Sequence, residues 1–324
     1  MNAAAKPIWR DPAMRPLVIG LVNNMGLSSM AAAKAQFAGL LATTGRATKL
    51  LCFTMRAPGD GLHDHLPIDA ITDHPIDAII VTGMEVTTSD LRDEWIWQGF
   101  TRLHDWAEQE ALPAIWSCLA AHAAVLHRDG IARQPVGAKL SGVFDCQHGG
   151  TVHRLTNGLP KRWRCPHSRY NGISGEALVA HGYSVISHGE DVGVDIFTRE
   201  NDPASFYFQG HPEYQAGTLL QEFLRDLRRY MAGETFICPS VPAFYLDNPA
   251  EAAFLALRAQ ALAGHDVMPA ARALARQVAF RQGWAGAAAH LYANWLNIVV
   301  EHMSRKSAWT PAMDHAAQAG AARP

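Results

Sequence analysis

Short apolar runs alternate with amphipathic stretches through the first half of this chain, and this alternation constrains the fold more than any other feature. The apolar runs have the length of buried strands and cover residues 17–22, 49–53, 76–82 and 114–117. The accompanying stretches repeat apolar residues with the period of a helix, at 31–41, 97–110 and 119–127. The run Ile79-Ile80-Val81 is typical of a strand buried on both faces. The pattern predicts an α/β fold with a mostly parallel sheet flanked by helices.

The second half of the chain has a different pattern. Residues 183–187, 192–198 and 205–209 are predicted to be successive strands, and an apolar helical face follows at 219–227. The motif Asn248-Pro249-Ala250-Glu251 predicts a helix with Asn248 as its N-cap, which should run to about Gly264. A second helix is expected after Pro269, ending near Phe280.

These elements divide the chain into a main domain and smaller flanking parts. We expect an N-terminal arm at 1–16, the main domain at 17–240, a C-terminal helical extension at 241–303 that packs on the same domain, and a flexible tail at 304–324.

Composition and charge exclude several classes of protein. Charged residues make up 18% of the chain and the formal net charge is −2, so we expect no nucleic-acid partner and no membrane surface. The N-terminal residues lack the apolar core of a signal peptide, and no run reaches the ~18 apolar residues of a membrane helix. The five cysteines include no C-x-x-C pair. Free thiols in a reducing cytoplasm are therefore expected, without disulfides or a metal site.

Cys118 lies where a predicted buried strand meets a predicted helix. Functional sites of open α/β sheets lie at the carboxyl ends of strands, and a helix N-terminus favours a thiolate. The small residues Ala120 and Ala121 would let the helix turn away sharply, as in a nucleophile elbow. The competing interpretation is a small buried core residue, which free cysteines often are.

His211 and Glu213 strengthen the interpretation of Cys118 as a nucleophile. They lie in the motif Gly210-His211-Pro212-Glu213-Tyr214, between a predicted strand and a predicted helix. A cysteine nucleophile requires a nearby imidazole, and the imidazole requires a carboxylate that fixes its tautomer. The alternative is a loop histidine beside a helix-capping glutamate.

Further residues are candidates for binding a substrate. Backbone N–H groups of Gly83 or Met84, together with Leu119, could form an oxyanion hole, although Gly83 could equally be an ordinary strand-to-loop glycine. Side chains that could hold the carboxylate of an amino acid are Lys139, Ser168, Arg169 and Arg225. Each of them, taken singly, could instead be a surface salt-bridge residue.

The order and content of these motifs resemble a known family. A cysteine after a strand with His-Pro-Glu far downstream is similar to the class I glutamine amidotransferase fold, a flavodoxin-like sheet. More specific motifs, covering the chain from about Leu17 to Val300, resemble the homoserine O-acyltransferase family, usually called homoserine O-succinyltransferases. These motifs are Lys139-Leu140-Ser141-Gly142-Val143, Pro166-His167-Ser168-Arg169-Tyr170, Gly210 to Tyr214, Gln221 to Asp226, and Asn294-Trp295-Leu296-Asn297.

The resemblance implies acyl transfer from a coenzyme A thioester to homoserine in methionine biosynthesis. Cys118 would carry the acyl group, His211 would activate the homoserine hydroxyl, and Glu213 would orient His211. Lys139, Ser168, Arg169 and Arg225 would be substrate-site residues. The resemblance also implies a cytoplasmic homodimer with acyl-CoA and homoserine as its small-molecule partners and no bound cofactor.

The chain departs from the family pattern at several places. The first loop contains no lysine before Lys34, whereas the family carries lysines there. An acidic residue in the loop after Gly83 would favour acetyl over succinyl, but the aligned position holds Thr87 and Glu85 lies two residues earlier. The donor therefore stays open between succinyl and acetyl. Residues 249–282 look like an insertion.

Other functions remain possible on the sequence alone. Serine lacks one methylene of homoserine, a difference worth only ~1–3 kcal/mol in a pocket, so a serine-like acceptor is an alternative. A glutamine-hydrolysing amidase is another, although the residues around Cys118 lack the flanking glycines of that group. A catalytically inactive binding protein on the same fold is the third, and the intact set of Cys118, His211 and Glu213 argues against it.

Overall fold

The computed structural model describes residues 15–57, 64–150, 152–281 and 283–309. The predicted N-terminal arm at 1–16 lies almost entirely outside these residues. A ten-stranded sheet forms the centre of the molecule, in the order β3-β2-β1-β4-β5-β10-β9-β8-β6-β7. The first six strands in this order are mutually parallel, and each later strand is antiparallel to its neighbour.

The parallel strands are β1 (Leu17–Val22), β2 (Thr48–Thr54), β3 (Leu66–Pro67), β4 (Ala78–Val81), β5 (Ala114–Ser117) and β10 (Asp202–Phe208). The other strands are β9 (Gly193–Arg199), β8 (Tyr183–Gly189), β6 (Gln134–His148) and β7 (Arg162–Gly172). All four residues of β4 and of β5 are buried, which explains why their sequences are continuous apolar runs. The prediction of a mostly parallel sheet flanked by helices is confirmed, but the sequence analysis did not assign β6 and β7.

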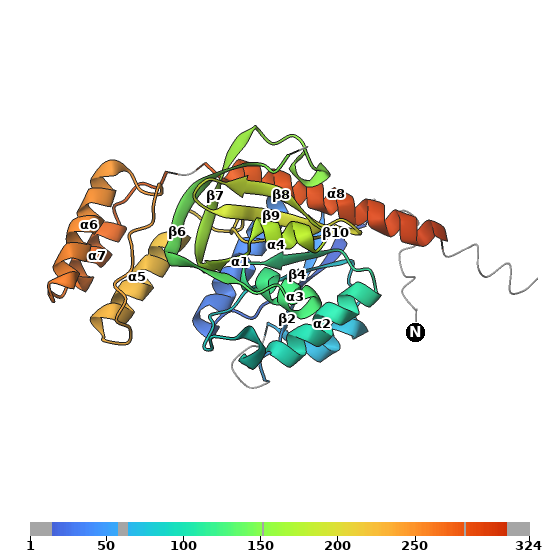
Figure 1. The fold of residues 1–324 in the computed structure, drawn as a ribbon, viewed down its shortest axis with the longest axis horizontal. Coiled ribbons are helices and arrows are strands. Elements are labelled where there is room, and N and C mark those ends of the chain that lie inside the picture. Colours follow the sequence, from blue (N-terminus) through green and yellow to red (C-terminus); the bar gives the residue numbers. More distant parts are fainter. Residues whose placement is uncertain (1–14, 58–63, 151, 282, 310–324) are drawn as a thin grey trace, which may run out of the picture.

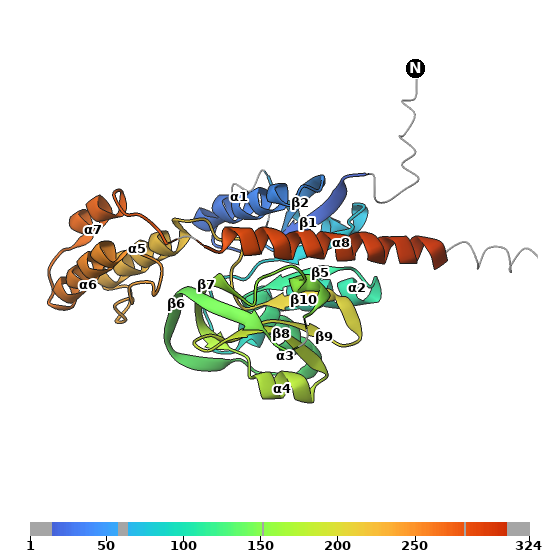
Figure 2. The ribbon, with the colours of Figure 1, turned by 90° about the horizontal axis from the view of Figure 1, so that it is seen from above.

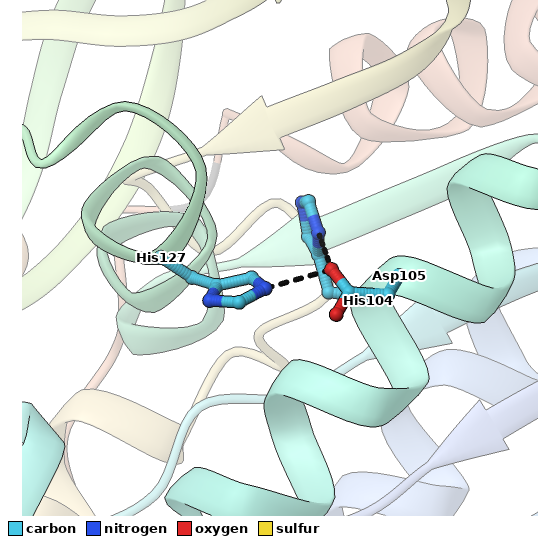
Figure 3. Close-up of side chains that lie close together, drawn as sticks. All are labelled: His104, Asp105 and His127. Atoms are coloured by element: carbon cyan, nitrogen blue, oxygen red, sulfur yellow. Dashed lines mark hydrogen bonds and ion pairs between the residues drawn. The ribbon is translucent and has the colours of Figure 1, made fainter.

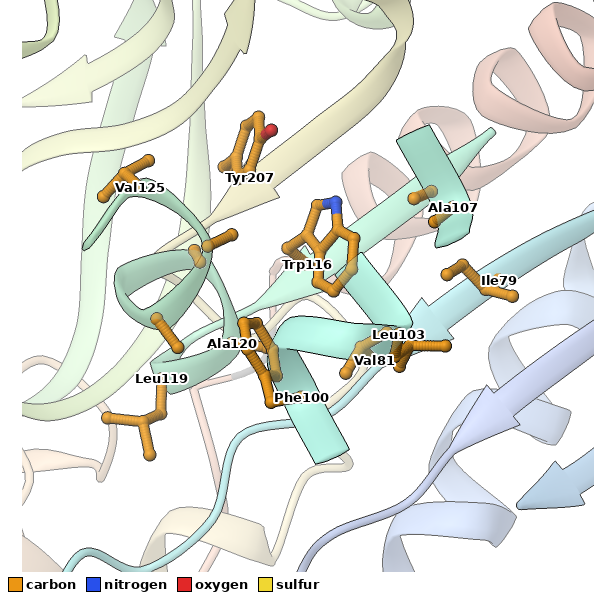
Figure 4. Close-up of a cluster of buried hydrophobic side chains, with 14 of the residues drawn as sticks. Ile79, Val81, Phe100, Leu103, Ala107, Trp116, Leu119, Ala120, Val125 and Tyr207 are labelled. Atoms are coloured by element: carbon orange, nitrogen blue, oxygen red, sulfur yellow. The ribbon is translucent and has the colours of Figure 1, made fainter. Parts of the chain in front are cut away.

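Helices cover both faces of the sheet (Figures 1 and 2). α1 (Leu27–Thr43) and the long α8 (Ala285–Trp309) lie on one face, where Phe37 and Trp295 join a core with strand residues such as Ile80. α2 (Trp97–Gln109), α3 (Leu119–Asp129) and the short α4 (Gly175–Ala180) lie on the other. In that second core Phe100 of α2 packs edge-on against Trp116 of β5, at a ring-centroid distance of 5.5 Å (Figure 4). The two cores fix the position of the β5–α3 junction from both sides.

The remaining helices form a separate layer at one end of the molecule, beyond β6 (Figure 1). They are α5 (Thr218–Met231), α6 (Asn248–Leu262) and α7 (Met268–Ala275). Phe223 of α5 packs against Phe254 of α6, and Ala271 of α7 belongs to the same core. The residues of the predicted extension at 241–303 therefore pack in two places. α6 and α7 pack against α5, whereas α8 packs along the sheet.

Three predicted boundaries of the C-terminal helices are wrong. Asp247, not Asn248, is the N-cap of α6, because its carboxylate accepts a hydrogen bond from the Ala250 N–H at 2.9 Å. The second helix was predicted to end near Phe280, but α7 ends at Ala275. Phe280 instead forms an isolated β-bridge with Leu246. α8 continues to Trp309, past the predicted start of the tail at 304, and residues 310–324 lie outside the described part. No helix in the described part of the chain is long and apolar enough to cross a membrane.

Candidate active site

The backbone at Cys118 makes a sharp turn between β5 and α3. Cys118 has φ 53° and ψ −112°, a conformation that residues other than glycine rarely adopt, and it is the N-cap residue of α3. Its N–H donates to the Phe208 carbonyl of β10 at 2.7 Å, which holds the turn at the carboxyl end of the sheet. Cys118 is half-buried, whereas the other four cysteines are buried. Backbone strain of this kind is found at functional sites, so the geometry favours the elbow over the buried-core alternative.

His211 lies beside this thiol and is held by its own neighbours. Its Nδ1 is 2.8 Å from Glu213 Oε1, its N–H donates to the Pro166 carbonyl at 2.7 Å, and its ring stacks on Tyr214 at a centroid distance of 4.3 Å. Burial disfavours the charged imidazole. The negative charges of Cys118 and Glu213, and hydrogen bonds to both side chains, nevertheless hold the pKa of His211 well above its ordinary value. The arrangement therefore favours the protonated, imidazolium form of His211.

These groups open into a cavity of about 300 Å³ at the carboxyl ends of the parallel strands. Ten of the residues singled out in the sequence analysis as site residues line the cavity together with Cys118. The lining residues from that set are Gly83, Met84, Glu85, Cys118, Leu119, Lys139, Ser168, Arg169, His211, Glu213 and Arg225. Residues separated by more than a hundred positions in the sequence are therefore brought to one site.

Gly83 lies against the first turn of α3. A Cβ atom at this position would be 3.1 Å from the Leu119 nitrogen and 3.2 Å from Leu119 Cβ, closer than ordinary contacts. Leu119 directly follows Cys118, so its N–H is beside the thiol at the N-terminus of the helix. Only glycine leaves this N–H uncovered, which is what an oxyanion-binding position requires.

A network of charged side chains forms another wall of the cavity. Lys139 Nζ is 2.7 Å from Asp226 Oδ2, and Arg225 Nη2 is 2.8 Å from Asp226 Oδ1. Glu222 accepts hydrogen bonds from the Ser168 hydroxyl and, at 2.6 Å, from the Tyr214 hydroxyl. The wall thus presents cations, carboxylates and hydroxyls together, from β6, β7, α5 and the loop that precedes α5.

The sequence analysis did not assign Glu222 and Asp226 to the site. A signal was available, because positions 222, 225, 226 and 229 share one face of α5, opposite the buried Leu220, Phe223 and Leu227. Arg133 also lines the cavity and was missed, and it donates to the Ser89 carbonyl at 3.2 Å.

Arg169 is placed differently from the other predicted substrate-binding residues. It is 5% exposed, and its guanidinium donates to the carbonyls of Asn171, at 2.7 Å, and of Val192. Burial lowers the pKa of Arg169, and the charge of Cys118 opposes that shift. Its charge therefore acts on the cavity, while its guanidinium is hydrogen-bonded within β7 and to Val192, the residue before β9.

The two candidates for acyl specificity lie apart. Glu85 lines the cavity and pairs with Arg229 of α5. Thr87 is not a lining residue, because its N–H and hydroxyl donate to Glu94 at 2.6 and 3.0 Å. Lys34, the first lysine after the opening loop, pairs with Asp64 at 3.3 Å and does not line the cavity either.

Comparison with known proteins gives consistent results along most of the chain. The sequence family described as homoserine O-succinyltransferase matches residues 6–305. Homoserine O-succinyltransferase of Rhodopseudomonas palustris is 41% identical over 302 residues, which is 89% of each chain. The enzyme of the same name from Methylorubrum extorquens is 36% identical over 318 residues, covering 94% of this chain and 93% of its own.

Solved structures of low sequence identity share the fold. A glutamine amidotransferase from Methylobacillus flagellatus aligns with a TM-score of 0.51 at 16% identity, covering 87% of this chain and 94% of its own. A second one, from Thermotoga maritima, has a TM-score of 0.50 at 8% identity, with coverages of 89% and 99%. Together with the family match, these likenesses confirm the resemblance: the chain belongs to the homoserine O-succinyltransferase family and has a class I glutamine amidotransferase-like fold.

Proposed function

We propose that this protein transfers the succinyl group of succinyl-CoA to the hydroxyl of L-homoserine, in methionine biosynthesis, through an acyl-enzyme on Cys118. The observation that carries the proposal is the meeting of a strained cysteine, a paired histidine and a wall of mixed charge in one cavity. The names of the relatives favour succinyl over acetyl as the acyl group.

In the first half-reaction the Cys118 thiolate attacks the thioester carbonyl of succinyl-CoA. The carbonyl oxygen gains negative charge, and the N–H of Leu119, with that of Gly83 or Met84, would donate hydrogen bonds to it. The tetrahedral intermediate collapses, the bond to the sulfur of coenzyme A breaks, and the His211 imidazolium protonates the departing thiolate. The products are free coenzyme A and a thioester on Cys118.

In the second half-reaction the roles of His211 are reversed. Acylation removes the negative charge of Cys118, and with it one of the causes that raise the pKa of His211, so the neutral imidazole becomes available as a base. His211 removes the proton of the homoserine hydroxyl, which attacks the thioester. Glu213 holds the Nδ1 side of the ring throughout. The ester leaves and the Cys118 thiolate is restored.

The charged wall suits a zwitterionic amino acid. Arg225 and Lys139 offer donors for its carboxylate, and Glu222 and Asp226 offer acceptors for its ammonium group. Before substrate binds, these side chains satisfy one another, so binding exchanges internal ion pairs for pairs with the substrate. The acyl chain would then lie on the side of Gly83 and Glu85.

The proposal also covers the co-substrate and the oligomeric state. Coenzyme A thioester is a co-substrate, and the acyl-transfer steps use no bound cofactor. The resemblance implies a homodimer in the cytoplasm, and light scattering after size-exclusion chromatography would test the dimer.

Steady-state turnover tests the substrates directly. We expect the highest kcat/KM with succinyl-CoA and homoserine, lower values with acetyl-CoA or with serine, and no glutamine hydrolysis. A serine-specific enzyme would invert the preference between the acceptors, and glutamine hydrolysis without acyl transfer would support the amidase instead. Because homoserine and serine differ by one methylene, the preference between them should be about 10- to 200-fold.

A further inference from the structure

Arg133 is a cation of the cavity that the described residues leave largely unpaired. The lysine and arginine side chains that line the cavity are Arg133, Lys139, Arg169, Arg225 and Arg229. Three of them form ion pairs with carboxylates, and Arg169 is buried and donates to backbone carbonyls. Arg133 is half-buried, and its only hydrogen bond with a described residue goes to the Ser89 carbonyl at 3.2 Å. Most of its guanidinium donors are therefore available to a ligand in the cavity.

The two carboxylates whose charges act on Arg133 are held by other groups. Glu94 accepts hydrogen bonds from the backbone N–H groups of residues 87–88 at 2.6 and 2.7 Å. Asp90 pairs with Arg92 at 2.7 Å. Burial lowers the pKa of Arg133, and the charges of Glu94 and Asp90 oppose that shift without forming an ion pair with it. A carboxylate on a ligand can therefore form the close pair that these two side chains do not.

The C-terminal end of α3 places Arg133 at the cavity. Gly130 has φ 69° and ends the helix in a left-handed turn, and the next residue, Ile131, is buried. The same end of α3 is joined to α2, because His127 Nε2 lies 2.7 Å from Asp105 Oδ1 (Figure 3). Arg133 follows Ile131 by two residues, so the turn and the contact between the two helices fix where its side chain begins.

The charge of Arg133 acts on groups at the thiol side of the cavity. His122 lies one turn after Cys118 in α3 and also lines the cavity. Burial lowers the pKa of His122 to about 4, and the charges of Arg169 and Arg133 add to this shift. The charge of Cys118 in turn acts to raise the pKa of Arg133. Arg133 is thus near enough to the thiol for their charges to interact.

We infer that Arg133 binds the terminal carboxylate of the succinyl group and thereby selects succinyl-CoA over uncharged acyl donors. This inference rests on the proposed function and names the residue that recognises its acyl group. The succinyl carboxylate lies two methylenes beyond the carbonyl that Cys118 attacks, and burying it without a partner would be costly. A guanidinium offers a carboxylate two parallel N–H groups. Arg133 stays protonated and binds the acyl group in the donor and on the enzyme alike.

The alternative is that Arg133 binds the carboxylate of homoserine. Lys139 and Arg225 already offer donors for that group, and they lie beside Asp226, an acceptor for the ammonium group. The two possibilities predict different kinetics. Recognition of the acyl group affects acylation of Cys118, which needs no homoserine, whereas recognition of homoserine affects only the second half-reaction.

The test compares succinyl-CoA with butyryl-CoA, whose acyl chain has the same length but ends in a methyl group. Single-turnover release of coenzyme A at sub-saturating donor, without homoserine, measures acylation by each. In Arg133→Met, acylation by succinyl-CoA should fall about 10- to 100-fold because a charge-assisted pair is lost, and acylation by butyryl-CoA less than about 3-fold. Arg133→Lys keeps the charge without the planar fork, so its ratio of the two rates should lie between wild type and Arg133→Met.

Arg92→Met is the matched control. Arg92 is an exposed arginine that pairs with Asp90 near the same loop, and it does not line the cavity. Its removal changes the net charge by the same amount as Arg133→Met. This variant should keep the wild-type ratio of acylation by the two donors.

Several outcomes would overturn the inference. One is a folded Arg133→Met variant that keeps the wild-type ratio, and another is a raised KM for homoserine with unchanged acylation. Loss of the preference in Arg229→Met but not in Arg133→Met would assign the carboxylate to Arg229 instead. If Arg133→Met does not fold, Arg133→Gln, which can still donate to the Ser89 carbonyl, decides by the same ratio.

Failure of the proposed function would look different, because it would appear in the wild type. A wild-type chain that is acylated equally by succinyl-CoA and butyryl-CoA, or by acetyl-CoA alone, would contradict the succinyl donor and the role of Arg133 together. A wild type that prefers succinyl-CoA, with the preference kept in the Arg133 variants, would contradict only the role of Arg133.

Discussion

Replacing Gly83 by alanine tests the proposed oxyanion-binding position. The added methyl would lie 3.1 Å from the Leu119 nitrogen and 3.2 Å from Leu119 Cβ, whereas carbon atoms normally keep about 3.5–4.0 Å from their neighbours. The Leu119 nitrogen is a backbone atom and Leu119 Cβ is bonded directly to the backbone, so neither can rotate away. The methyl would therefore cover the Leu119 N–H or push it from its position beside Cys118.

The expected cost follows from losing one donor to the developing oxyanion. Such a loss typically lowers kcat about 100- to 1,000-fold, or about 2.7–4 kcal/mol. Rapid-quench measurement of coenzyme A release from succinyl-CoA isolates this step from homoserine binding. The KM for homoserine should change less than the acylation rate, because the added methyl meets the Leu119 backbone rather than a side chain of the charged wall.

Gly39→Ala is the matched control, since a Cβ at Gly39 in α1 meets nothing within 4 Å. This variant should keep full activity and gain up to about 1 kcal/mol of stability from better helix propensity. If Gly83→Ala folds and its acylation rate falls less than about 10-fold, equivalent to about 1.4 kcal/mol, the Leu119 N–H does not bind the oxyanion.

Three further variants test other parts of the account. Glu213→Gln removes a charge that raises the pKa of His211, so the alkaline limb of kcat/KM for succinyl-CoA should move to lower pH, as measured by pH–rate profiles. Arg225→Gln should raise the KM for homoserine about 10- to 100-fold, because a charge-assisted hydrogen bond is lost, while single-turnover acylation by succinyl-CoA stays unchanged. Asp247→Ala should lower the free energy of unfolding by about 1 kcal/mol in urea titrations, and Asn248→Ala by less, because Asp247 caps α6.

For each of these three variants, one outcome would contradict the expectation. An unchanged alkaline limb in Glu213→Gln would mean that another group sets it. Slower acylation in Arg225→Gln would place this residue on the donor side. Equal losses of stability at 247 and 248 would contradict the capping assignment.

The parallel part of the sheet could be predicted from the sequence because burial on both faces requires continuous apolar runs. β4 and β5 are examples, since every residue of each is buried. β6 could not be recognised in this way. Its first five residues are exposed and only its later part reaches the core, so its composition resembles that of a loop.

Cys118, His211 and Glu213 could be singled out from the sequence because each lies in a short motif, and the fold brings all three to one cavity. The charged wall was only partly predicted, since Glu222 and Asp226 become site residues through the tertiary placement of α5 against the cavity. Thr87 illustrates the opposite case. Its position after Gly83 suggested a role in acyl specificity, but hydrogen bonds to Glu94 hold it away from the cavity, and the sequence contains no sign of that pairing.

Intact-protein mass spectrometry after mixing with succinyl-CoA alone tests the central claim most directly. With homoserine omitted, the account predicts that the chain gains about 100 Da and that digestion locates the addition on Cys118 as a thioester. The addition should be absent in Cys118→Ala and should disappear when homoserine is supplied. Continued turnover of Cys118→Ala, or an adduct on a different residue, would contradict acyl transfer through this thiol.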